Sequence, residues 1–197
     1  MTTRKTLRQN LRARRRALDR KTRTQAAESL MALLSALPCY QSAQHLAAYV
    51  AVEGELDPES LLRQAHGDGK QIYLPVVPPE RTGSLRFLPW KPGMVMRPNR
   101  LGIPEPPVAN TVGIAPQDLD LVLTPLVAFD SAGHRLGMGG GFYDRTFAFV
   151  KAGAHKPLLL GLAYEFQRLD RIEEASWDVP LAGVVTERRA YFFAAAD

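Results

Sequence analysis

The sequence predicts an α/β fold in which helices cover both faces of a mostly parallel sheet. Short apolar segments alternate with helical ones along the 197-residue chain, and this alternation is typical of parallel strands joined by helices. A glycine-rich segment follows one apolar run and precedes an expected helix, and such sheets bind ligands in the loops that follow strands. Because 46% of the residues are hydrophobic, the chain can form one domain with a substantial core.

Two helices are expected at the amino-terminal end. Residues 3–18 carry an apolar stripe of three leucines, and a threonine at position 2 or 3 can cap the first turn. Asp19 can cap a second helix over about 20–37, which Pro38 would end. The leucines expected to face inward from this second helix are Leu30, Leu33, Leu34 and Leu37.

Strands and further helices follow in alternation. The strands expected from apolar runs lie within 45–52, 71–77, 85–88, 121–123, 156–164 and 184–193. The further helices are expected over about 58–66 and 142–150. The proline-rich section between the third and fourth strands is predicted to be a loop over the sheet rather than a linker, because apolar residues continue through it.

The positive charge is concentrated at the amino-terminal end. Residues 1–23 contain ten Lys or Arg against one acid, so this segment is +9 and the rest is −4 in a chain of net charge +5. Arg4, Arg8 and Arg12 are four residues apart and form a row on one helix face. Either an anion offsets their mutual repulsion or the row is a solvated basic face; for residues 14–16 the solvated face is favoured.

Cysteine usage and hydropathy favour a cytoplasmic protein without a membrane partner. No apolar run reaches the roughly 18 residues of a membrane span, and the Arg-rich start lacks the apolar segment of a secretory signal. Cys39 is the only cysteine, so no internal disulfide forms, which fits a reducing compartment. We expect Cys39 to be a small residue near a helix end rather than a nucleophile, since no base can be assigned to it.

The loop between Leu121 and Phe147 is the strongest functional signal. It carries five glycines, followed by Phe142, Tyr143 and Asp144 at the start of an expected helix. Glycines let the backbone approach a ligand closely, and successive N–H groups in front of a helix bind anions such as phosphate. The acid beside them suits a magnesium ion shared with phosphates.

Common glycine motifs do not explain this loop. A Walker loop requires Gly-Lys followed by Ser or Thr, and none is present. The dinucleotide and kinase fingerprints require G-x-G-x-x-G, whereas Phe142 occupies the place of the last glycine. A flexible surface loop remains the alternative, but the order of loop, helix and acid favours a phosphate site.

The segment 125–145, PLVAFDSAGHRLGMGGGFYDR, resembles the signature of the 5-formyltetrahydrofolate cyclo-ligase, or 5,10-methenyltetrahydrofolate synthetase, family. The resemblance extends towards both chain ends. It implies one three-layer α/β/α domain over residues 1–197, Rossmann-like and of the NagB/RpiA/CoA-transferase-like type. It also implies ATP-dependent closure of 5-formyltetrahydrofolate to 5,10-methenyltetrahydrofolate with Mg²⁺. The implied partners are ATP and folate, which can be polyglutamylated, with no nucleic acid, in a monomer.

The resemblance also implies site residues. Those implied for ATP are Arg4, Lys5, Arg8, Arg135, Leu136, Gly137, Met138, Gly139, Gly140, Gly141, Phe142 and Tyr143. Those implied for folate are Tyr49, Val50, Glu55, Met138, Gly139, Gly140, Gly141 and Phe142. Those implied for Mg²⁺ are Asp144 and Asp178. The alternatives are a surface acid near a helix start for Glu55 and a loop acid or cap for Asp178. Arg145 stays unassigned.

Some positions depart from the family pattern. Arg4 stands where lysine is common, and Met138 and Gly140 stand where some relatives carry basic residues. Leu101, in the segment LGIPEP that resembles a folate-lining segment, replaces a tryptophan of some members. We therefore expect backbone N–H groups and arginines to stabilise the phosphates, with Arg135 supplying a charge at the γ-phosphate.

The mechanism implied by the resemblance requires no general base. The formyl oxygen attacks the γ-phosphorus of ATP, the nitrogen at position 10 adds to the activated carbon, and phosphate leaves. An amide oxygen carries no proton, so no catalytic acid or base is assigned, and His134 need not act. Positioning and charge neutralisation would dominate.

Two other classes of function remain open. The basic amino-terminal segment is compatible with an RNA-binding module, although it lacks interleaved aromatics, and such binding would weaken steeply with salt. A related domain that binds nucleotide or folate without turning it over is the second. An assay of methenyl product with ATP and magnesium separates these from the ligase.

Overall fold

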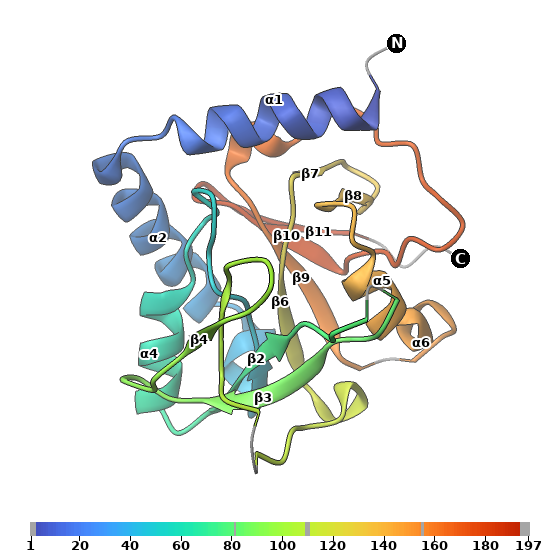
Figure 1. The fold of residues 1–197 in the computed structure, drawn as a ribbon. Helices are drawn as coiled ribbons and strands as arrows, with labels where there is room; N and C mark the ends of the chain where they lie inside the picture. The colour runs from blue at the N-terminus through green and yellow to red at the C-terminus, as the bar shows by residue number, and fades with distance from the viewer. Residues whose placement is uncertain (1–2, 81, 109–110, 155, 194–197) are drawn as a thin grey trace.

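A seven-stranded sheet forms the centre of the computed structural model, which describes residues 3–80, 82–108, 111–154 and 156–193 (Figure 1). Its strand order is β11-β10-β9-β6-β1-β2-β3, and the neighbours from β10 to β2 are parallel. The edge strands β3 and β11 are antiparallel to their neighbours. The strands are β1 His45–Ala47, β2 Gln71–Val76, β3 Arg86–Trp90, β6 Leu121–Pro125, β9 Leu158–Leu162, β10 Gly183–Val185 and β11 Ala190–Phe192.

Helices cover both faces of this sheet, as predicted. They are α1 Arg4–Arg16, α2 Arg20–Ser35, α3 Pro38–Ser42, α4 Glu59–Gly67, α5 Phe142–Thr146 and α6 Ala148–Lys151, with short 3₁₀ turns η1 Pro116–Asp118 and η2 Glu165–Gln167. Neighbouring residues of β6 point to opposite cores: Leu121 packs with α2 and α4, whereas Val122 packs with Phe147 beside α5. Two small hairpins complete the fold: β4 Arg97–Pro98 with β5 Pro104–Glu105, and β7 Ala128–Phe129 with β8 Arg135–Leu136.

The predicted caps and most elements are confirmed. Thr3 accepts a hydrogen bond from the N–H of Thr6, and Asp19 accepts one from the N–H of Thr22. Pro38 begins α3 instead of only ending the preceding helix, because proline is pre-organised for the first helical position. The helix expected over 142–150 is divided at Phe147 into α5 and α6.

Two of the predicted strands differ in length or form. The segment expected over 45–52 pairs with its neighbours only as far as Ala47 and then continues, largely buried, to the edge of the sheet. The segment 184–193 is a hairpin of β10 and β11. Its turn is closed by the Thr186 hydroxyl, which accepts from the N–H groups of Arg188 and Arg189. Apolar composition alone does not reveal such a turn.

The carboxyl ends of β1 and β6 lie at the same edge of the sheet, because these two strands are adjacent and parallel. The loop after β1 and the glycine loop beyond β6 therefore meet there, as predicted. Helix α1 lies across this edge (Figure 1). Among the residues that the structure describes, no helix has the length and apolar character needed to cross a membrane.

Candidate functional site

Helix α1 is fastened over the sheet edge by its arginines. The Arg8 Nε donates to the carbonyl oxygen of Gly137 over 2.8 Å. One turn earlier, an Arg4 guanidinium nitrogen lies 3.4 Å from the carboxylate of Asp178. The row of cations expected from the sequence therefore faces the body of the protein. Lys5, on the same helix, is exposed.

Arg12 continues this row to the loop after β1. Its guanidinium makes two hydrogen bonds with the Glu53 carboxylate, of 2.7 and 2.8 Å. This bidentate pairing lowers the pKa of Glu53 below its ordinary value. The repulsion expected among the arginines is thus offset by a carboxylate of the protein itself.

Arg15 corrects a prediction. The sequence favoured a solvated face for residues 14–16, but the Arg15 side chain is only 1% exposed. Its Nε donates to the Glu53 carbonyl over 3.1 Å, and its Nη1 donates to the Leu126 carbonyl over 3.4 Å. Its Nη2 lies 3.4 Å from Glu55. Arg14 and Arg16 are exposed, as expected.

The loop after β1 holds Glu55 inward. The backbone takes positive φ at Glu53 (50°) and Gly54 (74°). A Cβ at Gly54 would lie 2.8 Å from the Arg15 carbonyl oxygen, so glycine lets the loop approach the end of α1. Glu55 is 8% exposed and accepts a hydrogen bond from the Val52 N–H over 3.1 Å. Burial raises the pKa of Glu55, while the charge of Arg15 opposes that rise.

Two tyrosines lie beside this glutamate. Tyr49 is buried and donates its hydroxyl to the Leu56 carbonyl over 2.5 Å, while Val50 is half-buried. Burial raises the pKa of Tyr143, with a further contribution from Glu55. The positive charge of Arg135 opposes this rise in the pKa of Tyr143.

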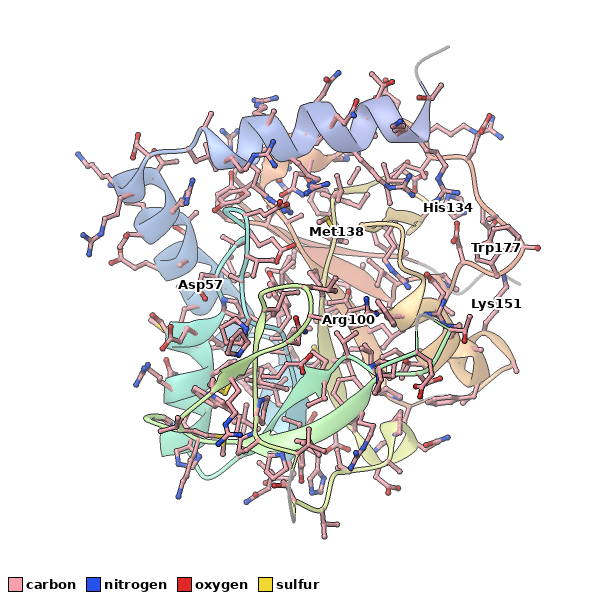
Figure 2. All side chains as sticks on the ribbon, viewed as in Figure 1. Asp57, Arg100, His134, Met138, Lys151 and Trp177 are labelled. Carbon is pink, nitrogen blue, oxygen red and sulfur yellow. The ribbon has the colours of Figure 1, made fainter. Side chains whose placement is uncertain are left out.

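The glycine loop presents its backbone at the surface. Residues 138–140 are exposed, whereas Leu136 before them is buried. Gly141 has φ 64° and caps α5, and a Cβ there would lie 2.7 Å from an Arg145 nitrogen. Helix α5 has five residues, so its dipole is small, and the amides of the loop carry the anion-binding capacity. Met138 lies beneath α1 in Figure 2.

Arg135 is directed inward, towards Asp144. It is 6% exposed. Its Nη2 donates to the Asp144 carboxylate over 2.5 Å, and its Nη1 donates to the Val179 carbonyl. The Val179 N–H also donates to Asp144, over 3.2 Å. Arg135, which the sequence predicts to supply a charge at the γ-phosphate, thus pairs with an acid beside the glycine loop.

Asp144 and Asp178 are compatible with magnesium bound together with phosphates. Their side chains are 20% and 14% exposed, and each pairs with one guanidinium. Within the described parts of the chain, no three His, Cys, Asp or Glu side chains cluster closely enough to form a metal site alone. Mg²⁺ is usually held by one or two carboxylates together with substrate phosphates, so these two acids fit the ion.

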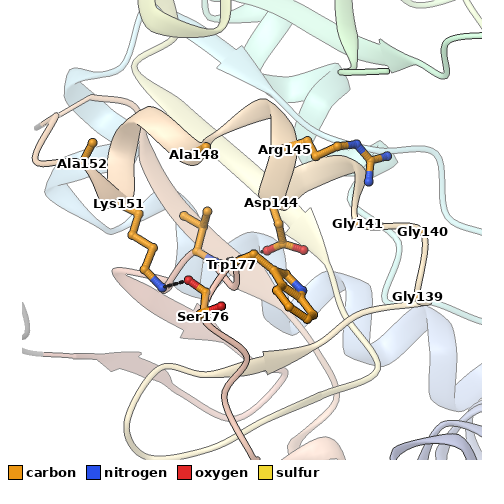
Figure 3. A pocket seen from close by; sticks show the side chains of 11 residues that line it. Gly139, Gly140, Gly141, Asp144, Arg145, Ala148, Lys151, Ala152, Ser176 and Trp177 are labelled. Atoms are coloured by element: carbon orange, nitrogen blue, oxygen red, sulfur yellow. Dashed lines mark hydrogen bonds between the residues drawn. The ribbon is translucent and has the colours of Figure 1, made fainter. Parts of the chain in front are cut away.

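A pocket of 690 Å³ opens beside the glycine loop (Figure 3). Its lining residues are Gly139, Gly140, Gly141, Asp144, Arg145, Ala148, Lys151, Ala152, Ser176, Trp177 and Val179. Lys151 donates to the carbonyls of Ser176 and Asp178, over 2.8 and 3.0 Å, and so holds the segment that carries Trp177. Trp177 lies close to Lys151, the last residue of α6 (Figure 2). Sequence reasoning missed both, although Trp177 adjoins an acid that it selected.

Three other residues considered from the sequence lie outside the lining of the pocket beside the glycine loop. His134 pairs with Asp130 over 3.0 Å at the β7–β8 turn, so it supports the hairpin. Burial raises the pKa of the half-buried Cys39 thiol, which disfavours the reactive thiolate. Leu101 is 53% exposed and offers no stacking surface comparable to tryptophan.

Comparison with known proteins identifies the family to which the chain is similar. The sequence matches the model of the 5-formyltetrahydrofolate cyclo-ligase family over residues 1–187. It is 36% identical over 181 residues to the 5-formyltetrahydrofolate cyclo-ligase of Escherichia coli K12, covering 92% of this chain and 98% of that one. The Haemophilus influenzae protein of the same name is 39% identical over 146 residues, covering 74% and 76%.

Solved structures agree with the sequence comparison. The NMR structure of Aquifex aeolicus 5,10-methenyltetrahydrofolate synthetase superimposes with a TM-score of 0.82 at 28% identity, covering 98% of this chain and 94% of that one. A 5,10-methenyltetrahydrofolate synthetase from Mycoplasma pneumoniae, at 22% identity and a TM-score of 0.73, covers 93% and 98% and shares the fold. The chain belongs to the 5-formyltetrahydrofolate cyclo-ligase family.

Proposed function

We propose that this chain catalyses the ATP-dependent cyclisation of 5-formyltetrahydrofolate to 5,10-methenyltetrahydrofolate, with release of ADP and phosphate, in folate one-carbon metabolism. The observation that carries the proposal is the family match over residues 1–187. The geometry supports it, because one sheet edge brings together the glycine loop, two acids, the arginines of α1 and the buried Glu55. The same proposal places the enzyme in the cytoplasm as a monomer.

The proposed ATP site lies between α1 and the glycine loop. Arg4 and Arg8 would exchange their present protein partners for phosphate oxygens, which form stronger charge-assisted hydrogen bonds than the Gly137 carbonyl does. The exposed amides of the loop would bind the remaining phosphate oxygens. The full proposed set is Arg4, Lys5, Arg8, Arg135, Leu136, Gly137, Met138, Gly139, Gly140, Gly141, Phe142 and Tyr143.

The proposed folate site lies beneath the end of α1. Glu55 uses one carboxylate oxygen for Arg15 and the other for the Val52 N–H. A carboxylate has about four acceptor positions, so capacity remains for pterin N–H groups. Tyr49, Val50 and loop residues 138–142 would complete the pocket, which places the formyl group beside the phosphate loop.

The chemistry proceeds by phosphorylation of an amide oxygen. The formyl oxygen attacks the γ-phosphorus, the bond to the ADP oxygen breaks, and the nitrogen at position 5 becomes an iminium centre. The nitrogen at position 10 then adds to the formyl carbon and loses its proton to water. The bond between the formyl carbon and its oxygen then breaks. Inorganic phosphate departs with that oxygen, and the methenyl bridge remains. The protein supplies orientation and a fixed cationic field for these steps.

Asp144 and Asp178 would hold magnesium against the phosphates. The ion supplies neutralisation of the phosphate charge. For this, Asp144 would separate from Arg135 and Asp178 would separate from Arg4. Both guanidinium groups would remain beside the phosphates. Bound nucleotide therefore changes the partners of two ion pairs.

The direct test is an assay of the product. Protein, ATP, magnesium and 5-formyltetrahydrofolate are mixed, and the near-ultraviolet absorbance of the methenyl product is followed. We expect a signal that requires both ATP and protein. If the folded protein produces no ATP-dependent absorbance while still binding either ligand in an equilibrium titration, the domain binds without turnover.

The RNA-binding alternative is not favoured by the contacts of α1. Arg4, Arg8 and Arg12 contact the protein, so the row predicted to meet a polyanion is directed at the site. Residues 14 and 16 remain exposed. RNA binding that falls steeply with salt and is lost on deletion of residues 1–23 would restore this alternative.

A further inference from the structure

Arg15 is a buried cation whose contacts extend beyond its own helix. Its side chain is 1% exposed, although the residues on either side of it are exposed. Its guanidinium reaches the Glu53 and Leu126 carbonyls and the Glu55 carboxylate. Leu126 follows β6 and Glu55 follows β1, so one side chain connects α1 with two loops of the sheet edge. Burying a charge is unfavourable unless it is compensated in this way.

The charge of Arg15 favours the ionised form of Glu55. The charged and titratable groups that face it are Arg15 and Arg12 of α1, Glu53 of its own loop, and the phenols of Tyr49 and Tyr143. Burial raises the pKa of Glu55 and Arg15 is the principal opposing influence, with the Val52 N–H next. The negative charge of Glu53 also raises the pKa of Glu55, so removing Arg15 would leave burial and Glu53 less opposed.

We infer that Arg15 is a positioning residue of the folate site, which holds Glu55 ionised and aimed at the pterin and ties its loop to the chain after β6. The inference rests on the proposed function, in which Glu55 accepts hydrogen bonds from the pterin. Arg15 does not contact the substrate itself. It acts through the orientation and charge of the carboxylate, leaving the remaining acceptor positions of Glu55 for the ligand.

A purely structural role makes a different prediction. If Arg15 only anchored α1, its loss would loosen the helix that carries Arg4 and Arg8, and the KM values for ATP and folate would rise together. Arg8 and Arg12 provide independent anchors, however, with hydrogen bonds of 2.7 to 2.8 Å. We therefore expect the loss to affect mainly folate and to depend on pH.

The experiment compares Arg15→Met, Arg15→Lys and the charge-matched control Arg14→Met, which removes an exposed arginine of the same helix. For each full-length variant, kcat and KM for ATP and for 5-formyltetrahydrofolate are measured from about pH 5 to pH 9. Wild-type turnover tests the proposed function, and the differences between variants test the inference, so the two can fail separately.

In Arg15→Met the pKa of Glu55 rises further, so the carboxyl is protonated at pH values where the wild-type group is ionised. The acid limb of kcat/KM for folate should move up by about one pH unit or more, a tenfold loss near the limb. Arg15→Lys keeps the positive charge and should restore the limb towards wild type. Arg14→Met should match wild type. KM for ATP should change less than threefold in all three variants.

Glu55→Gln and the double variant Arg15→Met/Glu55→Gln complete a cycle. The double variant removes both buried charges, so it should fold even if Arg15→Met does not. Adding Arg15→Met to Glu55→Gln should cause little further loss in folate kcat/KM, because the carboxylate through which Arg15 acts is gone. The inference is overturned if the acid limb of Arg15→Met stays at the wild-type pH. Equal increases in both KM values, or additive losses in the double variant, would also overturn it.

Discussion

At the scale of single residues, the charged groups of the site pair with one another. Arg4 pairs with Asp178 and Arg135 pairs with Asp144. The arginines expected to bind phosphate therefore form ion pairs with the acids expected to bind magnesium. This arrangement offsets the desolvation of four charged groups that are at least two-thirds buried. The sequence indicated these four residues as candidates, but not these pairings, because partner choice depends on side-chain packing.

Replacing Asp144 by asparagine tests its role directly. Asp144→Asn keeps the size of the side chain but removes its charge, so kcat should fall by about two decades or more, the scale of a key electrostatic contact. The measurement is steady-state turnover with magnesium varied, together with the circular dichroism of the variant. Asp118→Asn, which removes an exposed acid of η1, is the control and should be unchanged. A folded Asp144→Asn protein with full kcat would refute the metal role.

Trp177 offers a reporter of the phosphate pocket. It is 70% exposed at the pocket beside the glycine loop, whereas the second tryptophan, Trp90, packs against the core. ATP binding should therefore change the fluorescence of Trp177 through a change in its environment. The change should persist in Trp90→Phe and disappear in Trp177→Phe. A nucleotide-dependent signal that survives in Trp177→Phe would place the nucleotide elsewhere.

At the scale of elements, the sequence predicted those features that depend on neighbouring residues in the chain. The caps at Thr3 and Asp19, the glycine loop before α5 and the parallel sheet all follow from residue type and periodicity. The break at Phe147 did not, because its ring is fully buried among other aromatic residues and tertiary packing decides the backbone there. Arg15 was mispredicted for a similar reason, although its i+3 spacing from Arg12 keeps it on the inward face.

Asp120 connects the amino-terminal ends of the parallel strands, opposite the proposed site. It accepts hydrogen bonds from the N–H groups of Gln44 and His45 at the start of β1, and from Lys156 before β9. Burial raises the pKa of Asp120, but these hydrogen bonds outweigh burial and lower it to about 2. A depressed pKa stabilises the fold above the unfolded-state value and loses that effect as pH falls through the folded-state value.

Asp120→Asn should therefore destabilise the protein in a pH-dependent way. The expected loss is about 2 kcal/mol near pH 7, from a shift of nearly two pH units. The difference between wild type and variant should shrink as pH falls from about 5 towards 2. Urea denaturation at several pH values measures it. A difference that stays constant across this range would show that the charge of Asp120 does not stabilise the fold.

At the scale of the whole molecule, the positive charge of the amino-terminal segment is concentrated on one side of the proposed site. The amino-terminal cations form one wall of the proposed site, while the remainder of the chain is net negative. Composition predicted the asymmetry and a polyanionic partner, and the docking of α1 gives that asymmetry a geometric role. What composition did not predict is that protein carboxylates already contact several of these cations.

Ionic strength should therefore affect nucleotide binding more than turnover. Screening of exposed charges increases as the Debye length falls from about 10 Å at 0.1 M to about 3 Å at 1 M. KM for ATP should rise several-fold between about 0.05 and 0.5 M NaCl, while kcat changes little. In Arg4→Ala the KM should start higher and depend less on salt. Salt dependence of equal slope in both proteins would contradict this role of Arg4.

The docking of α1 also determines the order in which its contacts can form during synthesis. Arg4, in the first turn of α1, pairs with Asp178, which lies 174 residues later in the sequence. During synthesis, α1, which carries seven Lys or Arg and no acid, can pair with Glu53 and Gly137 before the segment that carries Asp178 is made. A protein truncated before Asp178 would keep these contacts but would lack the Arg4 ion pair and the strands β10 and β11.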